Sequence, residues 1–122
     1  MNIVYNTAST NNMHTVVCAR EMIAPKARTA GSSNDLMLYT SDQSHSSIEK
    51  GAIAMNVGQH NVRKVPSDAE FRMRADALAK MIKEDKHAGK RPFCVVATIG
   101  TTSTTSIDPV PQIAAIAEQH DL

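Results

Sequence analysis

The chain has no tryptophan and only two phenylalanines and two tyrosines among its 122 residues. A packed core must therefore be built from Ala, Val, Ile, Leu and Met, and hydrophobic residues make up 42% of the chain. Nucleic-acid bases stack on aromatic side chains and their phosphates require a basic surface, whereas the net charge is only +1. The composition predicts a globular chain that does not bind nucleic acid.

Long apolar runs and a basic leader are also missing. The longest strongly apolar stretch, residues 93–97, is far shorter than the roughly 20 residues that cross a bilayer, so no membrane span or secretory signal is expected. Cys18 and Cys94 lie far apart in apolar runs, which predicts buried free thiols in a reducing compartment. The five histidines form no close pair, so no metal site is expected. The sequence predicts a soluble, cytoplasmic chain without a metal.

Apolar spacing predicts helices that alternate with short strands. A helix of roughly three turns is expected after residue 10, with an apolar face and hydroxyl N-cap candidates at Thr7, Ser9 and Thr10. Gly, Ser and Pro residues predict a loop over residues 24–34. Strands are expected at residues 36–40, 61–65 and 92–98. The last of these is apolar at successive positions, as expected for a parallel sheet covered by helices on both faces.

Three further helices are expected, each from a start or stop signal. Residues 46–49 have the Ser-x-x-Glu spacing of a capping box, in which each side chain satisfies a free amide at the helix start. Residues 67–70 are a second candidate box, before a helix that Gly89 ends. Asp108 is a candidate N-cap for the last helix, with Pro109 at its first position. The alternation of helices and strands predicts an α/β fold with a mostly parallel sheet.

Three segments are expected at the carboxyl ends of the strands, where open α/β sheets bind ligands. Residues 7–10 carry hydroxyl groups at a helix start that could bind an anion, although a plain N-cap is the simpler interpretation. His45 follows a strand, and a solvent-facing loop histidine is again simpler. Gly-Thr-Thr at residues 100–102 suits a turn and a ligand contact equally well. Neither a G-x-S-x-G elbow nor a P-loop is present, so the serines around His45 do not indicate a hydrolase.

Taken in order, four segments resemble the group II pyridoxal-phosphate-dependent amino-acid decarboxylases, the aromatic-L-amino-acid decarboxylase type. They are Thr-Ala-Ser at 7–9, Tyr-Thr-Ser-Asp-Gln-Ser-His-Ser-Ser at 39–47, Pro-Ser-Asp-Ala-Glu-Phe-Arg-Met-Arg at 66–74, and the run 92–109 that contains Gly-Thr-Thr. The resemblance implies that residues 1–122 are part of the large cofactor-binding domain of a fold-type I, aspartate-aminotransferase-like enzyme.

The resemblance also implies roles for four residues toward pyridoxal 5'-phosphate. Ala8 and Ser9 are expected to bind the phosphate through backbone amides and the Ser9 hydroxyl. His45 is expected to lie flat against the pyridine ring and to act as a catalytic residue near the substrate carboxylate. Thr102 is expected to contact the cofactor from the neighbouring strand end. The implied reaction is decarboxylation of an amino acid, aromatic by this resemblance, through an external aldimine and its quinonoid form.

Two groups that the family requires are not found in this chain. In the family, the Schiff-base lysine and the carboxylate for the pyridine nitrogen lie in sequence that would follow Leu122, and none of the seven lysines here is a convincing substitute. The resemblance therefore implies an internal fragment, truncated at both ends, that is inactive alone and belongs to a homodimer when complete. Two alternatives stay open: a non-catalytic α/β module that binds a phosphate-bearing ligand or a partner chain, and a truncated product without function. The amino acid used, and an aldehyde-forming oxidative variant of the chemistry, are also left open.

Overall fold

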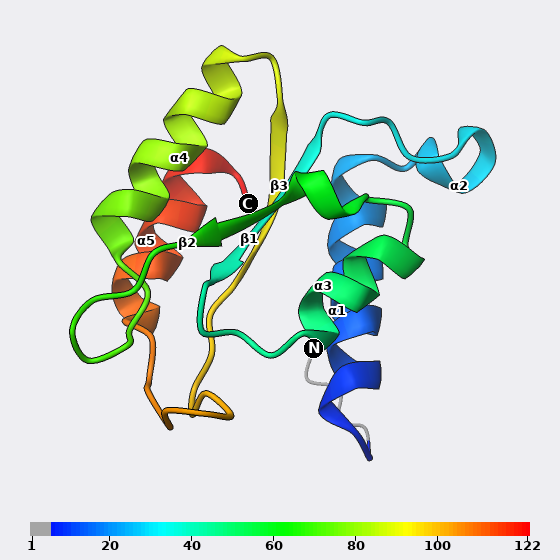
Figure 1. The fold of residues 1–122 in the computed structure, drawn as a ribbon. Helices are drawn as coiled ribbons and strands as arrows, with labels where there is room; N and C mark the ends of the chain where they lie inside the picture. Colours follow the sequence, from blue (N-terminus) through cyan, green and yellow to red (C-terminus); the bar gives the residue numbers. More distant parts are fainter. Residues whose placement is uncertain (1–5) are drawn as a thin grey trace.

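A parallel sheet of three strands forms the middle of the computed structural model, which describes residues 6–122 (Figure 1). The strands are β1 (Leu36–Ser41), β2 (Val62–Val65) and β3 (Arg91–Val96), in the spatial order β2-β1-β3. Both pairings are parallel, with Leu38 opposite Val62 on one side of β1 and Leu36 opposite Arg91 on the other. The prediction of an α/β fold with a parallel sheet is confirmed, and the predicted strands differ from the observed ones only at their ends.

Helices cover both faces of this sheet (Figure 1). On one face lie α1 (Ala8–Ile23) and α3 (Ser47–Ala54), and on the other lie α4 (Ala75–His87) and α5 (Val110–His120). Two short segments, α2 (Ala27–Ala30) and the 3-10 helix η1 (Gln59–Asn61), lie in connections between longer elements. Residues 24–34, expected to be a loop throughout, thus contain one helical turn.

The central strand β1 is buried along its whole length because both of its faces are covered. Leu36 and Leu38 belong to a core cluster with α1 and α3, whereas Met37 and Tyr39 belong to a second cluster with α4 and α5. Successive side chains of the strand therefore fill two separate apolar layers. Full burial of one large apolar side chain contributes roughly 1.5–3 kcal/mol, so these layers account for the main stabilising term.

Of the four predicted helix caps, the one at Thr7 is confirmed and the other three are wrong. Thr7 is the N-cap of α1, and its Oγ1 accepts a hydrogen bond from the Thr10 amide at 3.3 Å, as expected. The capping box at residues 46–49 is wrong, because Ser46 makes no side-chain cap. Glu49 instead accepts a hydrogen bond from Gln59 at 2.7 Å and pairs with Lys64 of β2. The carboxylate is thus used between elements and not at the start of its own helix.

The second predicted box, at residues 67–70, is also wrong, because this segment is a turn and α4 begins only at Ala75. Asp68 accepts hydrogen bonds from the amides of Glu70 and Arg72, both at 2.9 Å, and an antiparallel bridge between Ser67 and Met73 closes the turn. Short acidic side chains satisfy local amides in this way outside helices as readily as at an N-cap.

The last helix, α5, begins after Pro109, and the Asp108 side chain makes no hydrogen bond to it. The Asp108 carboxylate accepts instead from the amides of Met73 and Thr98, which lie in two other segments. The predicted capping role of Asp108 is therefore wrong, and Pro109, expected at the first helical position, occupies the cap position.

The two cysteines are free thiols in different surroundings. Cys94 of β3 is buried, and burial raises the pKa of its thiol to about 11, which keeps it protonated at neutral pH. Cys18 is exposed, so the prediction that it is buried is wrong. Cys18 lies on α1, and the buried residue of this helix is Val16.

Within residues 6–122, no helix is both long enough and apolar enough to cross a bilayer. The same residues contain no group of three or more His, Cys, Asp or Glu side chains that could hold a metal ion.

Candidate functional site

The segments that follow β1 and β3 meet the first turn of α1 at the carboxyl-terminal edge of the sheet. A cavity of about 440 Å³ lies between them. Its wall is formed by residues from these three segments, namely Ala8, Ser9, Asn12, His45, Ser47, Ile48, Val96, Ala97, Thr98, Ile99, Gly100 and Thr102. All four residues singled out from the sequence, Ala8, Ser9, His45 and Thr102, are among them. The fold thus brings together positions that are up to 94 residues apart (102 − 8 = 94).

The start of α1 presents free backbone donors to this cavity. Ala8 and Ser9 are its first two residues, and the first intrahelical bond runs from the Asn11 amide to the Thr7 carbonyl at 3.2 Å. The Thr10 amide is taken by the Thr7 side chain. The amides of Ala8 and Ser9 precede the helical ladder and have no acceptor within it, and they carry the positive end of the helix dipole. This end of the helix can accommodate an anion.

Within residues 6–122, the imidazole of His45 makes one short-range hydrogen bond. Its Nδ1 accepts from the Ser47 amide at 3.2 Å, so the proton of the neutral ring is assigned to Nε2. The ring thereby satisfies the first amide of α3. Because the imidazole is exposed and lines the cavity, its Nε2–H is a donor available to a bound molecule.

The turn before His45 uses the hydroxyl groups of its own serines. Ser41 Oγ accepts from the Gln43 amide at 3.1 Å, and the Ser41 carbonyl accepts from the Ser44 amide at 3.1 Å. Thr40 Oγ1 donates to Ser44 Oγ at 2.6 Å, and Asp42 accepts from the Ser67 amide. These bonds tie the hydroxyl groups of Ser41 and Ser44 into the turn.

Thr101 and Thr102 are adjacent in the loop after β3 but have different surroundings. Thr101 is 2% exposed, and its Oγ1 accepts from the Ser106 amide at 2.9 Å. The amides of Gly100 and Thr101 both donate to the Ser106 carbonyl, at 2.9 and 3.0 Å, in a tight turn that places Gly100 at φ +84°. Thr102 is exposed and lines the cavity, so its hydroxyl, unlike that of Thr101, can reach a bound molecule.

The cavity wall offers neutral donors and apolar surface. Among the residues that line it there is no Lys, Arg, Asp or Glu. The donors are backbone amides, hydroxyl groups and one imidazole, while Ile48, Val96 and Ala97 provide apolar contact. A phosphate group suits the start of α1, and a flat aromatic ring suits the imidazole. These features fit pyridoxal phosphate, whose phosphate and pyridine ring require both kinds of contact.

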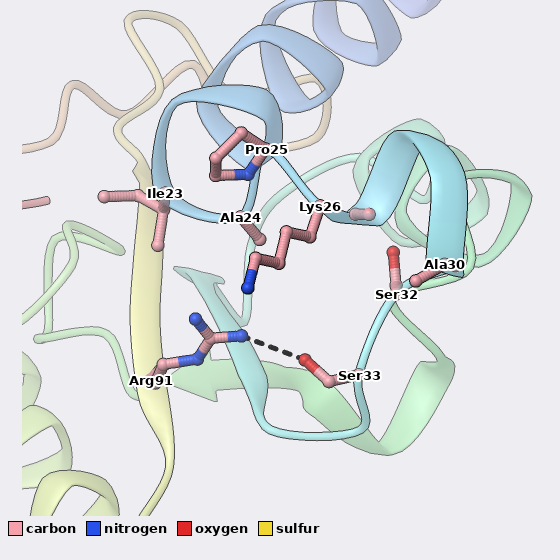
Figure 2. Close-up of a pocket in the computed structure, with 10 residues that line it drawn as sticks. Ile23, Ala24, Pro25, Lys26, Ala30, Ser32, Ser33 and Arg91 are labelled. Carbon is pink, nitrogen blue, oxygen red and sulfur yellow. Dashed lines mark hydrogen bonds between the residues drawn. The ribbon is translucent and has the colours of Figure 1, made fainter.

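A larger cavity of about 570 Å³ lies at the opposite end of the strands (Figure 2). Segment 23–33 and Arg91, the first residue of β3, line it. Arg91 donates to Ser33 Oγ at 2.9 Å and to Asp35 Oδ2 at 2.6 Å, and the first of these bonds is drawn in Figure 2. The hydrogen bond from Arg91 is the main reason that the pKa of Asp35 is below its usual value. None of the four candidate residues lies there, and the guanidinium charge is balanced by Asp35.

Three features of the site were not found from the sequence. Asn12 lines the cavity, and its spacing of three and four residues from Ser9 and Ala8 on α1 is a signal that would have identified it. Ser47 contributes through its amide, which carries no sequence signal. Asp108 was assigned to a helix cap, because its long-range acceptor role cannot be recognised from its neighbours in sequence.

Comparison with known proteins places these observations in a family. The family model for the pyridoxal-dependent decarboxylase conserved domain matches residues 1–122. The aromatic-L-amino-acid decarboxylase of Bos taurus is 35% identical over 127 residues, an alignment that covers 98% of this chain and 26% of the relative. The acidic amino acid decarboxylase GADL1 of Bos taurus is 37% identical, with 93% of this chain and 22% of the relative covered.

Solved structures agree with the sequence relatives. The crystal structure of mouse CSAD superposes with a TM-score of 0.94 at 34% identity and covers 98% of this chain and 26% of that one. The crystal structure of Catharanthus roseus tryptophan decarboxylase in complex with L-tryptophan has a TM-score of 0.88 at 32% identity, with the same coverage. The chain spans about a quarter of the length of these relatives. It belongs to the pyridoxal-dependent decarboxylase family, whose cofactor is pyridoxal phosphate.

Proposed function

We propose that this chain forms part of the cofactor site of a pyridoxal-phosphate-dependent amino-acid decarboxylase, a carboxy-lyase. The observation that carries the proposal is the single cavity lined by Ala8, Ser9, His45 and Thr102. When bound, pyridoxal phosphate supplies an electron sink for the electron pair left behind as the substrate carboxylate departs as CO₂. The contribution of this chain is to bind and orient that cofactor.

The start of α1 binds the phosphate in this proposal. The amides of Ala8 and Ser9 donate to phosphate oxygens, and the Ser9 hydroxyl adds a third donor. An anion at a helix N-terminus gains about 0.3–1 kcal/mol from the dipole alone, before its hydrogen bonds are counted. Since no cation lines the cavity, backbone amides are the principal phosphate donors that this chain supplies.

His45 and Thr102 orient the ring in the same proposal. The imidazole lies flat against the pyridine ring, a contact that contributes roughly 0.5–1.5 kcal/mol. With Nδ1 occupied by the Ser47 amide, Nε2–H would be the donor available to the substrate carboxylate. Thr102 contacts the cofactor through its hydroxyl, and the apolar side chains of Ile48 and Val96 limit access of water to this side of the cavity.

The Schiff-base lysine and the carboxylate for the pyridine nitrogen are proposed to lie outside residues 6–122. The absence of Lys, Asp and Glu from the lining of this cavity supports that assignment. The 122-residue chain alone is therefore proposed to be inactive.

For the whole protein we propose a cytoplasmic homodimer that decarboxylates an aromatic amino acid. The relatives include decarboxylases of both aromatic and acidic amino acids, and the aromatic type is proposed because segments 39–47 and 92–109 resemble it. Ile99, which lines the cavity, and its bridge partner Ile107 are 72% and 57% exposed, and a second copy is proposed to cover them. The two free cysteines are consistent with a reducing compartment.

The experiment that tests this function measures CO₂ release from aromatic L-amino acids by the protein at its full natural length, loaded with pyridoxal phosphate. The wild-type protein is expected to release CO₂, and His45→Ala is expected to lower both the rate and the cofactor affinity. His60→Ala, an exposed histidine away from the cavity, is the matched control and should retain both. A wild-type protein that binds no cofactor and releases no CO₂ from aromatic or acidic amino acids contradicts the proposal.

A further inference from the structure

Asp108 is a buried carboxylate that joins two loops at the carboxyl-terminal edge of the sheet. Its exposed fraction is 2%. Oδ2 accepts from the Thr98 amide at 2.8 Å, and Oδ1 accepts from the Met73 amide at 2.7 Å. Among the described residues no Lys, Arg or His forms an ion pair with this carboxylate, so backbone amides are its hydrogen-bond partners. Such charge-assisted bonds are stronger than bonds between neutral groups.

The loop that Asp108 holds is one wall of the cofactor cavity. β3 ends at Val96, and Thr98, Ile99, Gly100 and Thr102 line the cavity without strand pairing. The loop is closed on itself by the bridge between Ile99 and Ile107, by the bonds to Ser106 and by the bond from the Asp108 amide to the Thr98 carbonyl at 2.9 Å. These bonds fix its shape but do not fix its position relative to the rest of the molecule.

One hydrogen bond links this closed loop to another segment. The other hydrogen bonds of residues 98–108 stay within the loop or run to the adjoining α5. Within the described part of the chain, the one bond to any other segment is that from the Met73 amide to Asp108. Met73 is 1% exposed and belongs to the core cluster with α4 and α5. Asp108 therefore anchors the cavity wall to the core.

We propose that Asp108 is a positioning residue of the cofactor site. Its carboxylate fixes the position of residues 98–102 relative to the core and thereby keeps Thr102 at the cavity. This inference rests on the proposed function for its consequence to cofactor binding. The wall itself is a property of the chain without cofactor. A neutral isostere cannot replace the carboxylate, because the Asn amide group would place an N–H donor against one of the two backbone N–H donors.

The test compares Asp108→Asn and Asp108→Ala with Asp85→Asn in the protein at its full natural length. Asp85 is a matched control, since it is also buried, accepts a side-chain hydrogen bond from Tyr39 at 2.8 Å, and does not line the cavity. All variants are measured well below their unfolding temperatures. Asp108→Asn, which keeps one acceptor oxygen, decides the test if Asp108→Ala does not fold.

The first readout is hydrogen exchange of residues 97–107 in the cofactor-free protein. Loss of one bond to a charged group predicts roughly tenfold faster exchange in Asp108→Asn and an unchanged rate in Asp85→Asn. The second readout is the Kd for pyridoxal phosphate, with the induced circular dichroism of the bound cofactor as its spectroscopic signature. Asp108→Asn is expected to raise the Kd about tenfold and to change that dichroism, and Asp85→Asn is expected to change neither.

Equal exchange at residues 97–107 in Asp108→Asn and Asp85→Asn overturns the inference. So does an unchanged Kd together with unchanged dichroism in Asp108→Asn. If the wild-type protein does not bind pyridoxal phosphate, the proposed function fails by itself. The exchange readout then decides whether Asp108 positions the wall, because it does not require the cofactor.

Discussion

Tyr39 is fully buried in the central strand, and its hydroxyl group has a defined partner. It donates to Asp85 Oδ2 of α4 at 2.8 Å. Arg63 Nε of β2 lies 3.2 Å from the same oxygen, in an ionic contact whose geometry is too bent for a hydrogen bond. The Asp85 carboxylate of α4 thus joins β1 and β2 to that helix. It lies on the α4 side of the sheet and does not line the cavity at His45.

This environment predicts a pH dependence at the residue scale. Burial first, and then the hydrogen bond to Asp85, raise the pKa of Tyr39 above its usual value of 10.0. Because the folded-state pKa is raised, the contribution of Tyr39 to stability is fully present below pH 10 and is lost as pH rises through the folded pKa. Tyr39→Phe should remove this dependence. Urea unfolding at pH 7 and pH 10.5 measures it.

At pH 7, Tyr39→Phe is expected to lower the free energy of unfolding by about 1–2 kcal/mol, through loss of a buried hydrogen bond. Between pH 7 and pH 10.5, the wild-type protein should lose more stability than the variant. A wild-type protein and variant that lose the same amount of stability over this range would show that Tyr39 ionises as easily in the folded chain as in the unfolded one.

The residues that line the cavity lie at or near the ends of helices and strands. The first turn of α1 depends on Thr7, whose side chain accepts from the Thr10 amide. Thr7→Ala is expected to cost about 1 kcal/mol of stability and to weaken binding of pyridoxal phosphate, because a frayed first turn no longer aims the amides of Ala8 and Ser9. Urea unfolding and a cofactor titration measure the two effects.

Thr15→Ala is the matched control for this prediction. Thr15 also lies on α1, is exposed, and donates to the Asn11 carbonyl at 2.9 Å within the helix. Since alanine favours helix interiors, this change should leave stability equal or slightly higher and cofactor affinity unchanged. Equal loss of affinity in the two variants would mean that the start of α1 has no particular role.

The turn after β3 requires a positive φ at Gly100, and this requirement can be tested. Gly100 has φ +84°, and a Cβ there would meet no atom within 4 Å, so the cost of Gly100→Ala is backbone strain alone. The expected loss is about 1–2 kcal/mol of stability, with weaker cofactor binding through displacement of Thr102. Gly51→Ala in α3 is the opposite case.

Gly51 has a helical conformation, and an added Cβ would lie at an ordinary 3.7 Å from the Met13 backbone. Gly51→Ala should therefore gain up to about 1 kcal/mol from helix propensity and leave the cavity unchanged. Thermal unfolding measured by circular dichroism compares the two variants. A stabilised Gly100→Ala would show that this turn does not require a positive φ.

Much of the secondary structure could be predicted from the sequence, for physical reasons that differ between elements. The strand 92–98 and the face of α4 at Leu78 and Ile82 are found from apolar spacing, since burial alone determines them. The start of α3 after Ser46 is confirmed, but the side-chain caps predicted for α3, α4 and α5 are wrong. Hydroxyl and carboxylate side chains satisfy whichever amide is nearest in space, and for Asp108 that amide is 35 residues away at Met73.

The four candidate site residues illustrate the same limit. Local context alone favoured a loop histidine at position 45 and a plain cap at position 7. Their order along the chain suggested one site, and the parallel sheet brings them to one cavity because carboxyl ends of parallel strands share an edge. The hydrogen bond of the Ser47 amide to His45 depends on backbone geometry, which cannot be predicted from the residue types in this segment.

We propose that the chain supplies one part of a cofactor site that sequence outside residues 6–122 completes. The chain spans about a quarter of the length of its relatives, and no lysine lines its cavity. When the 122-residue chain is mixed with pyridoxal phosphate and reduced with borohydride, no single lysine should be labelled preferentially. Peptide mapping by mass spectrometry measures the labelling at the seven lysines. Labelling confined to one lysine would contradict the proposal that the catalytic lysine lies elsewhere.

Pyridoxal phosphate is proposed to occupy the cavity between the start of α1, His45 and Thr102. A crystal structure of the protein at its full natural length with this cofactor tests this placement. The expected result is a phosphate within hydrogen-bond distance of the Ala8 and Ser9 amides, with the pyridine ring stacked on His45 and Thr102 in contact. A cofactor bound elsewhere, or bound here with its phosphate away from α1, would contradict it.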